Sequence, residues 1–390
     1  MDNNLLLSPA LSKRFLDMAA RAAIRGMGDV EPNPLVGAVI VRSERDGTAP
    51  RIIGMGHHRK FGGPHAEVDA INDCRLRGED PSGATMYVTL EPCNHTGKTG
   101  PCTKSVLTAG ISRLVMARRD PNPIGGGGAE VLRKAGVQVT LSQASTLATR
   151  ISDPFVKRIT TGLPWVIAKW AQTIDGRVAT RDGDSKWISC ETSRRRVHRM
   201  RSRVDAILTG EGTIVADNPM LTARGVPRLR RLARRIVISR SLDLVFDFQI
   251  ITTAKQAPVT FFCSNAAYRS NQHFREYLQG RGAEVVPLPG VDGTTDLDLR
   301  AALKYLVEKH GISTVLVESG PRLMRRLFKQ DLVDEVHVYV APKILGDAEA
   351  HSAVDGFAVR QISATRKLSM LAMRRSGEDA LLMYGRGVMQ

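Results

Sequence analysis

Two short segments decide the first half of the chain: PHAE at residues 64–67 and LEPCNHTGKTGPC at residues 90–102. Together they supply one histidine, His65, and two cysteines, Cys93 and Cys102. A catalytic zinc ion takes three side-chain ligands and leaves a fourth position for water. The sequence therefore predicts a zinc site with His65, Cys93 and Cys102 as its ligands.

Glu67 lies two residues after His65 and is the predicted catalytic residue. Zinc lowers the pKa of a bound water molecule, and a neighbouring carboxylate can pass its proton to a leaving amine. The pattern His-x-Glu followed by Pro-Cys-x-x-Cys is typical of zinc deaminases. Here the loop between the two cysteines is longer. Two alternatives stay open: a closed structural zinc site with His95 as fourth ligand, and a site without metal.

The chain as a whole has the properties of a globular protein with two domains. It has 390 residues, of which 42% are hydrophobic, and no run of 18 apolar residues that would span a membrane. Its N-terminus does not resemble a secretory signal. Five cysteines in so long a chain do not indicate a disulfide framework. We expect a cytoplasmic protein that does not bind membranes.

Helix-like and strand-like segments alternate along both halves, which predicts an α/β fold with a largely parallel sheet in the first half. The alternation lapses near residues 142–150. A second α/β domain opens near Leu163 with the strand-like WVIAKWA. The predicted domains are residues 1–150 and 160–390. In the first half, helices are expected at 12–24, 66–74, 103–109 and 129–135, and strands at 35–41, 84–90, 114–117 and 137–141.

The net charge of +17 is concentrated between Arg194 and Arg235. A basic surplus indicates nucleic acid or small phosphorylated ligands as partners. Aromatic residues, on which single-stranded bases would stack, make up only 5% of the chain. The glycines at 125–128 lack the Gly-Lys-Ser/Thr ending of a phosphate-binding loop, and we interpret them as a flexible lead into the next helix.

The first half resembles a known family. PNPLVGAVIV at 32–41, PHAE, LEPCNHTGKTGPC and DPNP at 120–123 are similar to the N-terminal domain of the bifunctional riboflavin-biosynthesis deaminase–reductase family. The resemblance implies a cytidine-deaminase-like α/β/α sandwich. It implies deamination of 2,5-diamino-6-ribosylamino-4(3H)-pyrimidinone 5′-phosphate. It also implies that the substrate is held by Asn33, His57 or His58, His95 and Lys98.

The second half resembles the reductase domain of the same family, through AKWAQTIDGRVATRDGDSKWIS at 168–189 and MRSRVDAILTGEGTIVADNPMLTAR at 200–224. The implied fold is like that of dihydrofolate reductase, and NADPH would reduce the ribosyl group to a ribityl chain. Two arginines would suit a phosphate, because one guanidinium group can donate two parallel hydrogen bonds to two phosphate oxygens. The implied substrate-binding residues are Ser185, Arg201, Leu221, Arg224 and Glu318.

The turn after the strand-like Thr314–Glu318 is a further candidate for cofactor binding. Glycine there lets a ligand approach the backbone, and the following helix would present free N–H groups to a pyrophosphate. By resemblance, the NADPH-binding residues are Ala171, Trp187, Thr213, Asp217, Ser239, Gly320, Pro321, Arg322, Leu323, Met324, Arg325 and Arg326.

The sequence thus favours a bifunctional enzyme that uses Zn²⁺ and NADPH and acts on a small phosphorylated pyrimidine rather than on nucleic acid. Because members of the resembled family commonly associate, we expect a homo-oligomer. One alternative is a tRNA-type base deaminase with a basic accessory domain. Another is a non-enzymatic zinc module fused to a ligand-binding domain.

Overall fold

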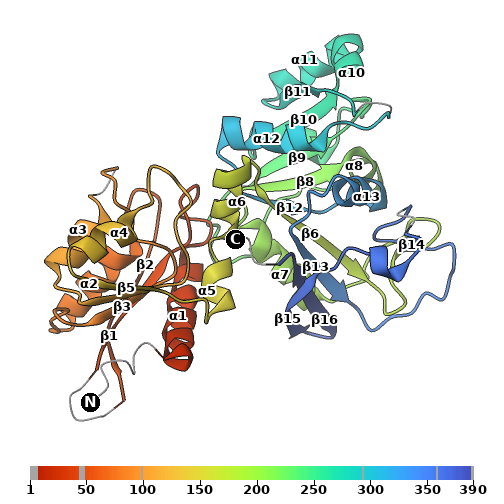
Figure 1. Ribbon diagram of the computed structural model, residues 1–390. Helices are drawn as coiled ribbons and strands as arrows, with labels where there is room; N and C mark the ends of the chain where they lie inside the picture. Colours follow the sequence, from red (N-terminus) through yellow and green to blue (C-terminus); the bar gives the residue numbers. More distant parts are fainter. Residues whose placement is uncertain (1–7, 44–48, 98–99, 292–293, 357–358, 388–390) are drawn as a thin grey trace. The chain divides into compact units, whose positions relative to one another are not determined.

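The computed structural model divides the chain into two compact units (Figure 1). The first unit extends to Gly162, and the second runs from Leu163 to Gly387. Lys98, which the family resemblance places at the substrate, lies outside the described residues. The described residues are 8–43, 49–97, 100–291, 294–356 and 359–387.

The first unit is a three-layer α/β/α sandwich. Its strands form one sheet in the order β2-β1-β3-β4-β5. Its strands are β1 (Gly37–Arg42), β2 (Arg51–His57), β3 (Thr85–Val88), β4 (Arg113–Met116) and β5 (Gln138–Leu141). Its helices are α1 (Pro9–Ala23), η2 (Ile24–Gly26), α2 (Ala66–Leu76), α3 (Cys102–Thr108), α4 (Gly128–Lys134), α5 (Thr146–Arg150) and α6 (Asp153–Thr161).

Two apolar clusters hold the layers of this unit together. On one face, Phe15 and Leu16 of α1 and Ala148 of α5 pack against alternate residues of β1, β3 and β4. On the other face, α2, α3 and α4 bury their apolar sides, including Ile71 and Leu132, against the remaining alternate residues. Both faces of the central strands β1, β3 and β4 are therefore covered, which explains why these three strands are almost continuously apolar.

The sheet is mixed rather than largely parallel, which corrects the expectation from the sequence. β3, β4 and β5 are parallel, but β1 is antiparallel to both β2 and β3. The strand β2 was not predicted, because Gly54 and Gly56 interrupt its apolar pattern. A Cβ on Gly56 would lie 2.2 Å from the backbone nitrogen of Ala70, so glycine lets α2 approach this strand closely.

The segment after residue 142, where the predicted alternation lapses, forms α5 and α6. Ser145 accepts a hydrogen bond from the backbone N–H of Ala148 (3.0 Å) and so caps α5. Asp153, the first residue of α6, is buried and pairs with Arg118 at the end of β4 (2.6 Å). Both helices therefore belong to the first unit.

The second unit contains a long mixed sheet in the order β11-β10-β9-β8-β12-β6-β13-β16-β15, and a small pair β14-β7. Its strands are β6 (Trp165–Gln172), β7 (Arg177–Ala179), β8 (Ala206–Gly210), β9 (Arg234–Ile238), β10 (Val259–Ser264), β11 (Glu284–Leu288), β12 (Thr314–Val317), β13 (Glu335–Val340), β14 (His351–Ser352), β15 (Ser369–Ser376) and β16 (Asp379–Gly385). Its helices are α7 (Glu191–Arg201), α8 (Glu211–Asp217), α9 (Gln249–Thr252), α10 (Asn265–Ser270), α11 (Gln272–Gly280), α12 (Leu299–His310), α13 (Pro321–Lys329) and η3 (Ile362–Ala364).

Helices cover both faces of this sheet. α12 and α13 pack on one face, where Leu303 and Met324 join the apolar residues of β6, β8, β9 and β12. α8, α9, α10 and α11 pack on the other face through residues such as Ile214 and Phe274. β12 lies between β8 and β6, so the chain order reverses there. Ligands of such sheets bind beyond the carboxyl ends of the strands at a reversal of this kind.

None of the described helices combines the length and the apolar character needed to cross a bilayer.

Candidate active sites and family

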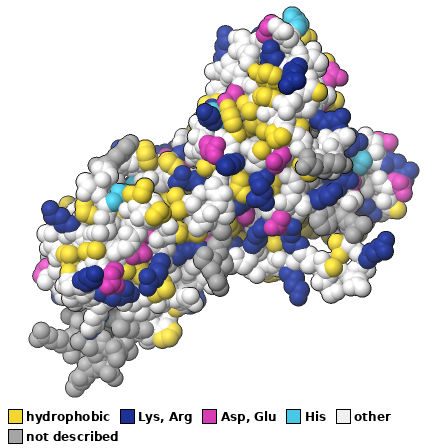
Figure 2. Space-filling model, turned by 45° about the horizontal axis from the view of Figure 1, so that its top comes forward, with side chains coloured by type: hydrophobic (Ala, Val, Ile, Leu, Met, Phe, Trp, Pro, Cys, Tyr) yellow, Lys and Arg dark blue, Asp and Glu magenta, His cyan; other side chains and the backbone are white. Residues whose placement is uncertain are grey.

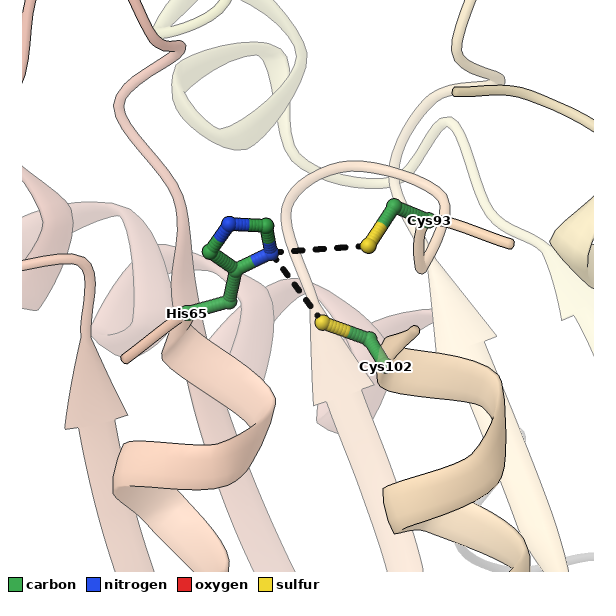
Figure 3. Close-up of side chains that lie close together, drawn as sticks. All are labelled: His65, Cys93 and Cys102. Carbon is green, nitrogen blue, oxygen red and sulfur yellow. Dashed lines mark hydrogen bonds between the residues drawn. The ribbon is translucent and has the colours of Figure 1, made fainter. Parts of the chain in front are cut away.

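The predicted zinc ligands converge on one point in the first unit (Figure 3). His65 lies immediately before α2, Cys93 lies in the loop after β3, and Cys102 is the first residue of α3. The Nδ1 atom of His65 is 3.2 Å from the Cys102 sulfur and 3.5 Å from the Cys93 sulfur. All three candidate ligand atoms lie within 4.8 Å of one another.

This donor set fits a catalytic zinc ion. One imidazole and two thiols supply three ligands, which leaves a position for water. His95, the candidate fourth ligand of a closed site, is not part of the metal-ligand cluster found among the described residues. The geometry thus favours an open site over a closed structural one.

The electrostatics of the cluster favour deprotonation of a thiol. Interactions with Cys102 and His65 lower the pKa of the Cys93 thiol, although burial opposes this effect. Interaction with Cys93 raises the pKa of His65. Contact with Cys93 also raises the pKa of Cys102, so one thiol of the pair loses its proton well before the other. A thiolate is the form in which cysteine binds a metal.

Glu67 lies in the first turn of α2 and is almost completely buried. Burial raises the pKa of its carboxyl group to about 7, because the charged form loses hydration. A carboxyl group that titrates near neutrality can both accept and donate a proton at physiological pH. Its position beside His65 and Cys102 is that of the predicted proton carrier.

Asn33 and His58 form a polar pair beside the zinc cluster. Asn33 Nδ2 is 3.1 Å from His58 Nε2, and His58 Nδ1 is 2.9 Å from the carbonyl oxygen of Pro64. The carbonyl can only accept, so Nδ1 carries the proton and Nε2 accepts from Asn33. Burial lowers the pKa of His58, which favours this neutral form. His57 instead lies near Asp69, so His58 is the better candidate of the two.

Two residues that the sequence analysis did not assign help to shape this site. The buried carboxylate of Glu91 accepts hydrogen bonds from the backbone N–H of Asp120 (3.0 Å) and of Ala129 (2.8 Å). It thereby joins the loop before Cys93 to the loop after β4 and to the start of α4. Burial raises the pKa of Asp120 to about 6. In the sequence, the acidic residue within Leu90-Glu91-Pro92 was the signal that could have indicated the role of Glu91.

The glycine run at 125–128 has a packing role. A Cβ on Gly128 would lie 1.9 Å from the carbonyl oxygen of Pro92, so only glycine fits there. His95 lies in the same region, and its Nδ1 is buried with no hydrogen-bond partner within the described part of the chain. A buried donor or acceptor without a partner is available to a ligand.

In the second unit, Arg201 and Glu318 form a paired contact beneath the carboxyl end of β12. Arg201 donates from Nε and Nη2 to the two Glu318 oxygens at 2.6 and 3.0 Å, and from Nη1 to the carbonyl oxygen of Thr222 at 3.2 Å. Lys169 of β6 lies 3.6 Å from the same carboxylate. Burial alone would raise the pKa of Glu318, but Arg201 and Lys169 lower it to about 2.

Lys169 was missed by the sequence analysis. Burial lowers its pKa. Within the strand WVIAKWA it is the charged residue among apolar neighbours, and this was the only sequence signal. Lys169 is therefore a candidate substrate-binding residue.

The structure changes the expectation for the two arginines. The donors of Arg201 described above are engaged by Glu318 and Thr222, so its guanidinium is already bound. Arg224 is exposed, and its backbone N–H donates to His198 Nδ1 (3.2 Å). Of the two, Arg224 is the better placed to bind the phosphate of a substrate.

The loop that carries Leu221 and Arg224 is held by a buried arginine of the neighbouring strand β9. Leu221 is buried. The fully buried guanidinium of Arg235 donates to the carbonyl oxygen of Met220 (3.3 Å) and to Thr253 Oγ1 (2.7 Å). These contacts fix the position of the predicted substrate loop on the sheet.

The predicted cofactor turn joins two helices at the carboxyl ends of β8 and β12. Gly320 precedes α13, and its backbone N–H donates to Thr213 Oγ1 of α8 (3.1 Å). Ser319 Oγ is buried, and among the described residues it has no hydrogen-bond partner. An unpaired hydroxyl beside a helix N-terminus fits the binding of an anionic cofactor.

Between Gly320 and Arg326, mainly backbone atoms rather than side chains face the predicted cofactor turn. Leu323 and Met324 are buried in the core. Arg326 pairs with Asp296 (2.7 Å), whereas Arg322 is exposed. Only some of the side chains predicted here from the resemblance are therefore free to meet a cofactor.

The remaining predicted positions lie in varied surroundings. Trp187 is 62% exposed, and the guanidinium of Arg194 lies over its ring at 4.6 Å. Ser239 at the end of β9 donates to Glu211 (2.9 Å). Asp217 pairs with Lys186 (3.3 Å). Ala171 packs against the cluster around Tyr339, and Ser185 is half-buried.

Comparisons with known proteins match each of the two units to a protein family. The family model of the cytidine and deoxycytidylate deaminase zinc-binding region matches residues 10–118. The model of the RibD C-terminal domain matches residues 164–382. The riboflavin biosynthesis protein RibD of Aquifex aeolicus is 35% identical over 377 residues, which cover 96% of this chain and 99% of that protein. This chain belongs to the RibD family.

Other RibD proteins agree. RibD of Escherichia coli is 34% identical over 94% of this chain and 97% of its own length. The structure of Acinetobacter baumannii RibD has a TM-score of 0.79 and 29% identity, and covers 97% of this chain and 100% of that one. A Thermotoga maritima structure, named as a diaminohydroxyphosphoribosylaminopyrimidine deaminase/5-amino-6-(5-phosphoribosylamino)uracil reductase, has a TM-score of 0.78 and 33% identity, with coverages of 97% and 99%.

The chain is accordingly a bifunctional deaminase and reductase of riboflavin biosynthesis. The predicted α/β fold is confirmed, with a cytidine-deaminase-like first domain and a RibD-type reductase domain. The zinc-binding deaminase domain and the reductase domain are consistent with Zn²⁺ and NADPH, and the His65–Cys93–Cys102 cluster agrees with the first.

Proposed function

We propose that the chain first deaminates 2,5-diamino-6-ribosylamino-4(3H)-pyrimidinone 5′-phosphate and then reduces the ribosyl group of the product to a ribityl chain. The observation that carries the first step is the convergence of His65, Cys93 and Cys102 beside the buried Glu67. The name of the Thermotoga maritima structure, which is similar over nearly the whole chain, supports both substrates.

In the deaminase site, His65, Cys93 and Cys102 would hold the zinc ion. When bound, zinc lowers the pKa of a water ligand toward neutrality and makes it a nucleophile. Glu67 accepts a proton from the attacking water and delivers it to the amine at C2, which leaves as ammonia. The buried position of Glu67 next to His65 and Cys102 supports both transfers.

Four residues, Asn33, His58, His95 and Lys98, complete the proposed pocket for the pyrimidine. Asn33 keeps its side-chain oxygen available because its amide nitrogen is bound to His58. His95 presents its unpaired Nδ1. Lys98, which the structure does not describe, is proposed from the family resemblance to bind the phosphate as a cation.

In the reductase site, NADPH supplies the hydride that C1′ of the ribosyl group receives. The turn before α13 would bind its phosphates through the Ser319 hydroxyl and the backbone N–H groups of Arg322 and Leu323 in the first turn of the helix. Glu318, Arg201 and Lys169 form a charged group that would orient the sugar hydroxyls. Ser185, Leu221 and Arg224 would complete the substrate site.

The other proposed cofactor contacts follow the family resemblance. They are Ala171, Trp187, Thr213, Asp217, Ser239, Gly320, Pro321, Arg322, Arg325 and Arg326, whereas Leu323 and Met324, whose side chains are buried in the core, would contribute their backbone only.

We assign deamination to the predicted domain 1–150, to which the first unit adds α6, and reduction to the predicted domain 160–390, in which the second unit begins at Leu163. The ranges of the two family matches, 10–118 and 164–382, support this assignment. We also propose a cytoplasmic homo-oligomer. Light scattering of the purified protein tests the association, and a monomer at micromolar concentration would contradict it.

We further propose that nucleic acid is not a substrate. Figure 2 shows Lys and Arg side chains on both units, intermixed with acidic ones. The RibD match extends over both units, which a base deaminase with an unrelated basic domain would not give. Efficient deamination of tRNA or single-stranded DNA would overturn this proposal.

The proposed substrates are tested by incubating the protein with the diaminopyrimidine phosphate and identifying the products by mass spectrometry. Without NADPH, we expect the deaminated ribosylamino compound to accumulate. With NADPH, we expect the ribitylamino compound. Reduction of the diamino substrate before any loss of ammonia would reverse the proposed order of the two steps.

A further inference from the structure

Arg158 lies on α6, outside both the family match at 10–118 and the predicted deaminase domain at 1–150. Its Nη2 donates to the carbonyl oxygen of Pro32 (2.9 Å), and its guanidinium lies 6.0 Å from the ring of Phe155. Burial lowers its pKa. The structure shows no carboxylate paired with it among the described residues. The charge of Arg158 is thus directed to a backbone carbonyl.

The segment of α6 around Arg158 is packed firmly against the first unit. Phe155 and Val156 are buried with Leu90, which precedes the loop of Cys93. Val36 and Ile159 complete this apolar cluster. Arg158 therefore stands on a packed helix, and its hydrogen bond ties Pro32 to that helix.

A continuous chain of contacts runs from Arg158 to the zinc cluster. Pro32 is followed by Asn33, whose Nδ2 donates to His58 Nε2 (3.1 Å). His58 Nδ1 in turn donates to the carbonyl oxygen of Pro64 (2.9 Å), the residue before His65. The rings of His58 and His65 are 5.2 Å apart. Each member is bonded to the next, so a shift at Pro32 is transmitted to Asn33.

Arg158 is well suited to fix the position of Asn33. Hydrogen bonds from a charged donor are shorter and stronger than neutral ones. Proline on both sides of Asn33 stiffens the backbone, and the Asn33 N–H is bound to the carbonyl oxygen of Val30 (3.0 Å). A displacement of about 1 Å of a substrate-orienting group can lower a rate by roughly 10²-fold.

We propose that Arg158 is a positioning residue of the deaminase site, which acts through Pro32 to orient Asn33. The inference rests on the proposed function, in which Asn33 contacts the pyrimidine. With this role, α6 contributes to the deaminase site, although it lies after residues 10–118, which the deaminase family model matches. A purely structural role for Arg158 would affect stability but would not act through Asn33.

The test is a double-mutant cycle on the full-length protein. The variants are Arg158→Met, Asn33→Ala and the two together, with deamination of the diaminopyrimidine phosphate measured without NADPH. We expect Arg158→Met to lower kcat/KM by about tenfold, with zinc content and reduction of the deaminated compound unchanged. We expect the double variant to be no slower than Asn33→Ala alone, because coupled residues are not additive.

Two further variants complete the test. Arg158→Lys keeps one charged donor for the Pro32 carbonyl and should recover part of the loss; it also carries the cycle if Arg158→Met does not fold. Arg133→Met is the matched control, because Arg133 lies on α4 of the same unit but has other partners: it pairs with Glu130 (3.5 Å) and donates to the carbonyl oxygen of Val139 (3.5 Å). The control should deaminate at the wild-type rate.

The outcomes separate the inference from the proposed function. An active Arg158→Met variant beside an impaired Asn33→Ala variant would overturn the inference alone. Effects that multiply in the double variant would also overturn it, since Arg158 would then act independently. A fully active Asn33→Ala variant would remove the proposed substrate contact and, with it, the role of Arg158.

Discussion

Arg201 and Glu318 are 117 positions apart in the sequence, yet the guanidinium donates to both carboxylate oxygens, at 2.6 and 3.0 Å. This pair links the end of α7 to the carboxyl end of β12. Both groups are largely buried, and their mutual attraction offsets the hydration that each charge loses on burial. The reductase site is therefore built around an internal ion pair.

Arg201→Ala should weaken both stability and substrate binding in the second unit. Loss of Arg201 leaves the buried Glu318 with Lys169, at 3.6 Å, as its remaining counter-charge, so the cost should not exceed the roughly 3–5 kcal/mol of a fully broken buried pair. We also expect the KM of the deaminated substrate to rise about tenfold or more, because the Thr222 carbonyl loses its donor too. The measurement is steady-state reduction, followed by NADPH absorbance.

Arg195→Ala is the matched control for this change. Arg195 lies on the same helix but is exposed and pairs with Glu191 (3.1 Å). Surface pairs of this kind contribute about 0.2–1 kcal/mol, so both KM and stability should stay close to wild type. If Arg201→Ala behaved like this control, the ion pair would not support the reductase site.

The stability of the second unit should fall at acidic pH because of Glu318. Its pKa is about 2 in the folded protein and about 4.3 in an unfolded chain. The ion pair is therefore fully stabilising above pH 4.3, and this contribution is lost as the pH falls toward 2. Glu318→Gln should remove this part of the pH dependence.

Tryptophan fluorescence is a suitable measurement, since all three tryptophans (Trp165, Trp170 and Trp187) lie in the second unit. Urea unfolding of wild type and Glu318→Gln would be compared between pH 6 and pH 3. Parallel curves for the two proteins would show that Glu318 does not carry the effect.

Much of the deaminase site could be predicted from the sequence, because its ligands come from short local segments. His65, Glu67 and Cys102 lie at the beginnings of helices, and Cys93 follows a strand, so spacing alone indicated their proximity. Residues linked by long-range packing were less accessible. The carboxylate that accounts for a buried charge at Lys169 belongs to Glu318, 149 positions later in the sequence.

The missed elements have a similar origin. β2 contains glycines that serve the close approach of α2, and these glycines hide its strand pattern. α5 and α6 are short, and α6 begins at Asp153, whose buried carboxylate pairs with Arg118 and Arg150. The sequence analysis consequently ended the predicted deaminase domain before Arg158.

Removal of zinc should separate the two activities. A strong chelator, or the change Cys102→Ser, should abolish deamination and leave reduction of the supplied deaminated compound intact. The ligands lie in the first unit, whereas the proposed reductase residues lie in the second. Zinc content by mass spectrometry and the two rates are measured together. Deamination that persisted after complete zinc loss would refute the metal site.

The most direct test of the account is the change Glu67→Gln in zinc-loaded protein. The amide keeps the shape of the side chain but cannot accept the proton of the attacking water. We predict that deamination falls by about 10²-fold or more, with zinc still bound and with reduction of the supplied deaminated compound at the wild-type rate. Deamination at the wild-type rate would contradict the account.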